Sequence, residues 1–578
     1  MSKRKYIITF FILSFVLQSF AQDLEKIGKK DMVTVGGGLN LSSVFYNANG
    51  IPNRRQPFTY FLNGNITANF LGISLPYTFN YSNNQISYSQ PYNIQSFNPT
   101  YKWIKGYAGI TSMNFSPYTQ SGHIFAGGGV ELTPKNFKFA ALYGRFKKAT
   151  PYDTDNNSDA NMAYKRMGWG GYAGYTFKGS EVKLIYFAAQ DDPTSLAFIP
   201  VTTSITPMRN TVVSVTGKTT LFKKLILKAE YALSGITRNV QSNIDIESAP
   251  KNRLPYIFST NPTSQFFQAY KASIGYRIKV VNLRFNYERV EPEYKTLGSY
   301  YFNNDLENFT FAPSATLLKG KLSLSANTGL QKNNLNGNKL NTTKRWVGSI
   351  NVAYMPSQKW TFNLNYSNFS SFTKQRPQDN PFYRNNLDTL NFYQLTQSGN
   401  ASVSHNFGNA NLKHALSLNT SYMVTGQKQG AISDATAFGI NQNISTPSKV
   451  VNANCSHNMQ LVKSKISIGY NFNTNYSEQG TFYTLFIGPG IMAGKSIVKN
   501  LIKINTGITF NKVYLNGTNN NNVLNARLSA NYNPKLKNPK VGKLGFTASA
   551  NYTQKLKAQN TNNVFNEFTG NVGVNYNF

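Results

Sequence analysis

Few residues of this chain are of the kinds that catalyse reactions or hold metals. The 578 residues include four histidines, His123, His405, His414 and His457, and a single cysteine, Cys455. An enzyme needs a nucleophile beside a base, or a metal with its ligands. No Gly-x-Ser-x-Gly motif and no zinc-binding spacing occurs in the sequence. We therefore expect no catalytic residues, no metal centre and no cofactor, and we expect that the protein is not an enzyme.

One stretch, YDTDNNSDAN at residues 152–161, carries oxygen ligands of the kind that calcium prefers. Asp153, Asp155, Asn157 and Asp159 recur at every second position, which loosely matches the ligand spacing of a calcium loop. The stretch lacks the usual glycine and the closing glutamate of such loops. A solvated turn is the simpler explanation, and calcium binding stays an open alternative.

The first residues predict export. Three basic residues at 3–5 precede an apolar run at 6–17, and small residues follow at Ser19 and Ala21, which is the pattern of a cleaved signal peptide. The apolar run is too short to cross roughly 30 Å of hydrocarbon as a helix. We expect three segments: a signal peptide at 1–21, a short periplasmic segment at 22–31 and a transmembrane β-barrel at 32–578.

The composition favours a barrel. Aromatic residues make up 14% of the chain and charged residues 14%, whereas soluble domains usually carry about 25% charged residues. No later stretch approaches the roughly 18 consecutive apolar residues of a transmembrane helix. A mean hydropathy of −0.37 fits strands that turn only alternate side chains toward lipid. The net charge is +36, but the basic residues are spread over the whole length, so we expect no nucleic-acid partner.

Alternation with a period of two residues recurs along the chain. In LILKAEYAL, LRFNYERV, IKINTGITF, WTFNLNY and ISIGYNF, apolar residues take one parity and mostly polar residues the other. Alternate side chains of a barrel strand face lipid and lumen. The polar parity is largely Asn, Ser, Thr and Gly. Five charged residues fall on it as candidate lumen-facing side chains: Lys228, Glu230, Arg284, Glu288 and Lys503.

The connections distinguish a barrel from a soluble sandwich or propeller, whose strands alternate in the same way. Tight turns, such as those at 71–72 and 178–180, alternate with long polar loops, such as 191–207 and 239–262. Short periplasmic turns and long extracellular loops are typical of outer-membrane barrels. About 12 short turns and about 13 long connections predict about 26 antiparallel strands. The number is 24 if a short hairpin around 105–106 is not counted.

Lysine is common in the predicted short turns. On the periplasmic side these residues would form a basic rim that attracts anionic lipid headgroups. Ordinary membrane anchoring explains such a rim, and an envelope protein subunit bound at the rim or at the long loops is the alternative. The rim residues are Lys105, Lys135, Lys178, Lys223, Lys224, Lys319, Lys321, Lys463, Lys465 and Lys499.

The chain ends FTGNVGVNYNF, with apolar residues in strict alternation up to Phe578. The last strand of a barrel must pair with the first to close the sheet. This ending resembles the carboxyl-terminal signal that the barrel assembly machinery reads in outer-membrane barrels, and Tyr576 and Phe578 carry the resemblance.

The whole chain is similar to the large outer-membrane β-barrel proteins of Bacteroidota. The similarity lies in the FAQ cleavage site, in the Asn- and Lys-rich strands and in two early segments, RRQPFTYFLNGNITANFLGISLPYTFNYS and SMNFSPYTQSGHIFAGGGVELTP. It implies a barrel in the outer membrane, in contact with outer-membrane lipids. It implies no particular activity, because fold does not settle function.

A barrel of about 26 strands is wider than the 16- to 18-stranded porins, which already enclose an aqueous channel. Our first hypothesis is a pore for hydrophilic solutes or polymers, in which the inward lysines and arginine favour anions and the two glutamates partly offset them. The alternative is a non-conducting structural or partner-binding subunit of an outer-membrane secretion, assembly or motility complex.

Overall fold

The computed structural model describes most of the chain beyond residue 32. The predicted signal peptide and periplasmic segment lie outside the described residues, and so do Asp155, Asn157 and Asp159 of the calcium hypothesis. Within the described part, no helix is both long enough and apolar enough to cross a bilayer. The described residues are 33–83, 95–153, 162–201, 203, 205–242, 249–300, 303–338, 344–368, 370–371, 392–429, 448–536, 538, 541–559 and 564–578.

These residues form 29 strand segments and one short 3-10 helix, η3 (Leu318–Gly320). In the first half of the chain the strands are β1 (Val33–Asn49), β2 (Phe58–Phe70), β3 (Ile73–Ser82), β4 (Gln95–Phe97), β5 (Thr100–Tyr101), β6 (Ile104–Asn114), β7 (Ser121–Leu132), β8 (Phe137–Lys147), β9 (Arg166–Phe177), β10 (Ser180–Asp191), β11 (Arg209–Leu221), β12 (Leu225–Thr237), β13 (Ser264–Ile278) and β14 (Val281–Val290). In the second half they are β15 (Leu306–Phe311), β16 (Ser314–Leu317), β17 (Leu322–Lys332), β18 (Lys344–Ser357), β19 (Trp360–Ser367), β20 (Ser370–Ser371), β21 (Phe392–Gly408), β22 (Leu412–Gln429), β23 (Ser448–Leu461), β24 (Ile466–Gln479), β25 (Phe482–Ile497), β26 (Ile502–Leu515), β27 (Thr518–Tyr532), β28 (Lys543–Leu556) and β29 (Phe565–Asn577).

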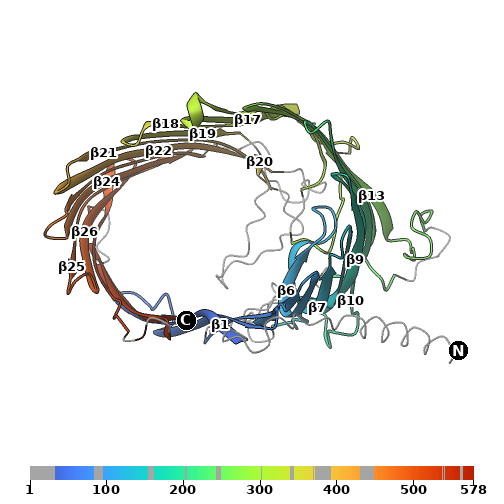
Figure 1. Cartoon of the computed structure of the whole chain (residues 1–578), viewed down its shortest axis with the longest axis horizontal. Coiled ribbons are helices and arrows are strands. Elements are labelled where there is room, and N and C mark those ends of the chain that lie inside the picture. The colour runs from blue at the N-terminus through green and yellow to red at the C-terminus, as the bar shows by residue number, and fades with distance from the viewer. Residues whose placement is uncertain are drawn as a thin grey trace.

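The strands make one antiparallel sheet that closes into a barrel (Figure 1). In the described part of the chain the 29 segments fill 26 positions, because β4 and β5 share a position, as do β15 and β16, and β19 and β20. The prediction of a barrel of about 26 strands is confirmed. β1 pairs with both β2 and β29, so the wall closes without leaving β1 or β29 as an open edge.

Alternate side chains point to opposite faces of the wall, as the sequence pattern predicts. Val215 on β11 and Tyr231 on β12 are cross-strand partners, and they are 46% and 45% exposed on the outer face. The adjacent pair, Ser214 and Ala232, points inward and is 1% and 0% exposed. Because the side-chain period is two, this register fixes which residues face outward and which face the lumen.

The first and last strands close the wall over twelve residue pairs, from Gly38 with Asn577 to Asn49 with Asn566. The ladder continues to the last residue. The N–H of Gly37 donates to the carbonyl of Phe578 at 2.9 Å, and the N–H of Phe578 donates to the carbonyl of Gly37 at 3.0 Å. The backbone of the terminal residue therefore belongs to the seam.

One end of the barrel carries the tight turns, and many of them place a lysine in a left-handed backbone conformation. Eight lysines there have φ between 41° and 58°, a left-handed conformation that glycine normally provides. These lysines therefore place positive charge in the turns at this end of the barrel. These residues are Lys102, Lys135, Lys178, Lys223, Lys279, Lys319, Lys465 and Lys499.

Two expectations about the connections are wrong: the position of one tight turn, and the presence of long loops throughout the opposite end. The turn expected at Lys105 and Gly106 lies three residues earlier, at 102–103, where Tyr101 pairs with Ile104. The N–H of Gly106 donates to the carbonyl of Pro99 at 2.7 Å, so this glycine belongs to the ladder of β6 and not to a turn. The hairpin itself exists, which is why the count of 26 holds.

The opposite end is not uniformly long-looped. The β24–β25 and β26–β27 connections are two-residue turns at 480–481 and 516–517. Asn516 and Gly517 have φ values of 48° and 82°, the positive values that a type I′ turn requires at both central residues. The Asn-Gly pair between two alternating strands was the sequence signal for this turn.

Gly329 on β17 gives a test of how closely the wall is packed. A Cβ at Gly329 would lie 1.8 Å from the carbonyl oxygen of Phe309, whereas a Cβ at Gly399 on β21 would meet nothing within 4 Å. We predict that Gly329→Ala destabilises the barrel by about 1–3 kcal/mol, because the neighbouring strand must move. The measurement is the temperature at which the folded, heat-modifiable form is lost on an electrophoresis gel. Gly399→Ala is the control, and equal behaviour of the two variants would contradict the prediction.

Candidate functional site

The lumen is the candidate functional site, and two of the connections that the structure describes fold into it. These are the β6–β7 loop at 115–120 and the inner strap, defined as residues 291–300 between β14 and β15. The hydroxyl of Tyr294 donates to the carbonyl of Tyr118 at 2.8 Å, and the hydroxyl of Thr296 donates to the carbonyl of Thr119 at 2.7 Å. All four of these residues are at most 2% exposed, so the two connections form one packed unit.

The inner strap is bound to the wall through Asn210 and Ser234. The side-chain carbonyl of Asn210 on β11 accepts from the N–H of Leu297 at 3.0 Å, and its NH₂ donates to the hydroxyl of Ser234 at 2.8 Å. Ser234 on β12 donates to the carbonyl of Lys295 at 2.7 Å. Both wall residues are fully buried and have the inward parity of Ser214. These bonds hold the inner strap against β11 and β12.

Apolar side chains fill the space between the wall and these connections. One cluster joins β6, β7, β8 and β10 to the inner strap, and a second joins β11 to β15 to both connections. Burial raises the pKa of Tyr294 well above its ordinary value, so its hydroxyl stays protonated and keeps donating. The clusters consist of Met113, Phe115, Phe125, Ala140, Leu142, Phe146, Ile185, Phe187, Ala189 and Leu297, and of Tyr118, Val212, Ala232, Ala269, Val290, Tyr294 and Leu306.

The sequence did not predict this packing. Residues 292–307 have the polar character of the other long connections, and nothing in them predicts a segment that folds into the lumen. A signal was present in β10, where LIYFAA at 184–189 is apolar on both parities. Such a run is typical of a strand that is covered on both faces. Leu184 is 56% exposed outside, whereas Ile185 is fully buried inside.

Four of the five charged residues expected in the lumen line one pocket of about 610 Å³, which we call the basic pocket. They are Lys228, Glu230, Arg284 and Glu288. Lys503 lies on β26, across the bore from β13 (Figure 1). Lys218, Lys271 and Glu181 complete the charged lining. Tertiary structure therefore brings four of these side chains together and leaves the fifth apart.

The carboxylates of the basic pocket are engaged by close neighbours. Lys271 lies 3.0 Å from Glu230 and its ammonium is 4.9 Å from the ring centre of Tyr118. The hydroxyl of Tyr118 donates to Glu288 at 2.7 Å. Tyr118 of the β6–β7 loop thus connects the packed unit to Glu288 in the basic pocket.

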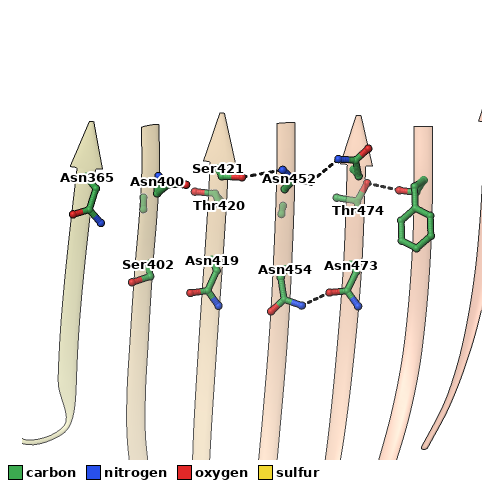
Figure 2. A pocket seen from close by; sticks show the side chains of 14 residues that line it. Asn365, Asn400, Ser402, Asn419, Thr420, Ser421, Asn452, Asn454, Asn473 and Thr474 are labelled. Atoms are coloured by element: carbon green, nitrogen blue, oxygen red, sulfur yellow. Dashed lines mark hydrogen bonds between the residues drawn. The ribbon is translucent and has the colours of Figure 1, made fainter. Parts of the chain in front are cut away.

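A second pocket, of about 460 Å³, lies on the inner face of β19 and β21 to β24 (Figure 2). Its side chains form two rows across the strands, which we call the amide ladder, and every residue in the lining is uncharged. Asn452 donates to the hydroxyl of Ser421 at 3.0 Å, and Asn454 donates to Asn473. One row is Asn365, Asn400, Ser421, Asn452 and Asn475, and the other is Ser402, Asn419, Asn454 and Asn473. Asn363, the ladder partner of Ser402, continues the second row on β19 outside the pocket lining.

Three of the histidines lie on the outer face, away from both pockets. His405 stacks on Trp360 at 3.9 Å between ring centres, and His414 lies 4.7 Å from Phe407. Nδ1 of His414 lies 3.1 Å from Nε2 of His457. Within the described residues, no group of three or more His, Cys, Asp or Glu side chains is placed to hold a metal ion.

The fourth histidine, His123, is 2% exposed. Its Nδ1 lies 2.8 Å from the carbonyl of Ile124, and its ring stacks on Tyr300 of the inner strap at 4.0 Å. His123, which lies on β7, therefore packs against the inner strap.

Comparison with solved structures finds similarity to other large barrels. BauA, the ferric preacinetobactin receptor from Acinetobacter baumannii, matches at 10% identity and a TM-score of 0.37 over 94% of this chain and 81% of that chain. The translocation pore of the P pilus usher PapC matches at 11% identity and 0.33, over 94% and 98%. OmpT, an outer membrane protein of Vibrio cholerae, matches at 10% and 0.27, over 64% and 98%. No protein-family model and no curated protein matches the sequence. Similarities this low say nothing about activity.

Asn210 gives a test of the inner strap. We predict that Asn210→Ala destabilises the packing of the inner strap against the wall by about 1–3 kcal/mol, because it leaves the buried N–H of Leu297 without its acceptor. The measurement is hydrogen exchange at 294–298, which we expect to become faster, together with tryptic cleavage after Lys295. Asn454→Ala, which also removes an inward amide but touches no part of the inner strap, is the control. Unchanged exchange in Asn210→Ala would show that the strap is held by other contacts.

Proposed function

We propose that this chain is an outer-membrane barrel of the Bacteroidota type that forms a pore for hydrophilic solutes or polymers. In this proposal residues 1–21 direct export, the outer wall contacts membrane lipids, and the protein is not an enzyme. The short-turn end faces the periplasm, with its lysines among anionic headgroups. An envelope protein at that rim or at the long loops is a compatible partner.

The outer face supports the membrane part of the proposal. Large apolar side chains such as Phe285, Leu364 and Ile508 are 58%, 50% and 50% exposed there. A monomeric soluble protein rarely exposes a continuous apolar belt, whereas a membrane barrel requires one about 25 Å tall.

The observation that carries the pore is the amide ladder. The inner faces of β19 and β21 to β24 present amides and hydroxyls in register, and no charged side chain lines the pocket between them. Such groups exchange hydrogen bonds with water or with hydroxyl-rich solutes at little cost, because each donates and accepts. The packed unit is confined to β6 to β15, so it covers only one side of a bore wider than that of a porin.

Charge added to the amide ladder tests the pore. We predict that the double variant Asn419→Asp, Asn454→Asp raises the permeability of potassium over chloride by about twofold, because carboxylates in a bore attract cations. The measurement is the reversal potential of the purified barrel in a planar bilayer under a KCl gradient. Asn516→Asp, the same change in a turn outside the bore, is the control. A wild-type barrel that stays silent at all voltages would reject the pore and favour the non-conducting subunit.

Phe578 tests the assembly signal. The seam bonds of residue 578 are made by its backbone, so Phe578→Ala should leave refolding into lipid vesicles nearly unchanged. We predict a several-fold loss of assembled barrel in cells, because the aromatic ring is what the assembly machinery reads. The measurement compares folded protein in both settings, with Phe568→Ala, 44% exposed on the same strand, as the control. Equal losses in cells and vesicles would assign the ring to stability alone.

A further inference from the structure

The basic pocket contains two like charges placed directly opposite each other. Lys218 on β11 and Lys228 on β12 are cross-strand partners, a position in which side chains of equal sign repel and destabilise a sheet by roughly 0.2–1 kcal/mol. Arg284 on β14 lines the same pocket. Among the described residues, none of these three cations has a carboxylate within ion-pair distance.

The nearby carboxylates are directed elsewhere. Glu181, which lies opposite Lys218 in the ladder, is bound by Lys138 at 2.8 Å and by Lys183 at 2.9 Å. Glu230 binds Lys271, and Glu288 accepts from Tyr118. The three acids are thus committed to other groups, and the three cations keep an uncompensated positive charge on one part of the wall.

The same pocket presents uncharged hydroxyl side chains beside the cations. Thr216 on β11, Ser273 on β13 and Thr310 on β15 line it. A hydroxyl both donates and accepts hydrogen bonds. A ligand that fits this wall therefore has an anionic group for the cations and hydroxyl groups for these side chains.

We propose that Lys218, Lys228 and Arg284 bind a uronic-acid unit of an acidic polysaccharide. The carboxylate of the sugar lies among the three cations, where charge-assisted hydrogen bonds are strong, and the sugar hydroxyls bond to the hydroxyls of Thr216, Ser273 and Thr310. The inference deepens the proposed function and rests on it, because the ligand reaches the pocket through the bore. The uncharged amide ladder, which lies further along the wall on β19 and β21 to β24, suits neutral parts of the same polymer.

The test is calorimetric titration of the mature barrel, in neutral detergent at low salt, with trigalacturonic acid. We expect saturable binding that weakens about tenfold or more in the variant Lys218→Gln, Lys228→Gln, Arg284→Gln, because each substitution removes a charge-assisted contact. Lys503→Gln removes an inward cation from the far wall and should leave the affinity unchanged. The gel mobility of the folded form checks that the triple variant is intact.

Two further ligands decide the chemistry. Maltotriose, which has the hydroxyls without the carboxylates, should bind at least tenfold more weakly, and inorganic phosphate should bind more weakly than trigalacturonic acid. Equal binding of phosphate, equal binding by the triple variant, or no binding of trigalacturonic acid would each overturn the inference. Conductance of the same preparation separates the two proposals: a conducting barrel without binding rejects only this site, whereas binding to a silent barrel rejects only the pore.

Discussion

Closure of the wall between β1 and β29 is the constraint on which the rest of the structure depends. In the proposed membrane setting, every backbone N–H and carbonyl of a strand must find its partner within the protein. An antiparallel sheet satisfies this condition only if its two edge strands pair with each other. Here the pairing extends from Asn49 to the last residue, where Gly37 and Phe578 exchange two backbone hydrogen bonds.

Closure at 26 positions creates a second problem, since a wall of this circumference encloses more space than its own side chains fill. The chain solves it differently on the two sides of the bore. From β6 to β15 part of the wall is covered by the β6–β7 loop and the inner strap, with apolar clusters between them and the wall. Along β19 and β21 to β24 it is covered by polar side chains that bond to one another and leave a pocket. The covered part, between β6 and β15, resembles the interior of a soluble protein. The polar part, on β19 and β21 to β24, offers hydrogen-bonding groups to water.

The basic pocket lies beside the packed unit, on the strands from β10 to β17. Tyr118 joins the packed unit to Glu288, and beyond it the cations of β11, β12 and β14 face open space. The arrangement depends on the inner connections, because Tyr118 and Lys271 engage acidic groups that would otherwise be free to pair with Lys218, Lys228 or Arg284. The packing of one loop thereby sets the charge of a wall that it does not cover.

The sequence by itself determined the class of fold, the strand number to within one hairpin and the parity of the strands that alternate clearly. These features follow from local rules: alternation in stretches such as LRFNYERV fixes the two faces, and the ending at Phe578 predicts a closing strand. The inward orientation of Lys228, Glu230, Arg284 and Glu288 follows from the same period of two.

Only the tertiary structure decided what those inward faces meet. Residues 118 and 288 are separated by 170 positions in the chain, and no periodicity relates a loop to a strand seven or eight positions along the wall. The same holds for the separation of Lys503 from the other charges, which depends on how far β26 and β13 lie apart around the closed ring. A strand pattern specifies which way a side chain points, and closure specifies which other side chains it finds there.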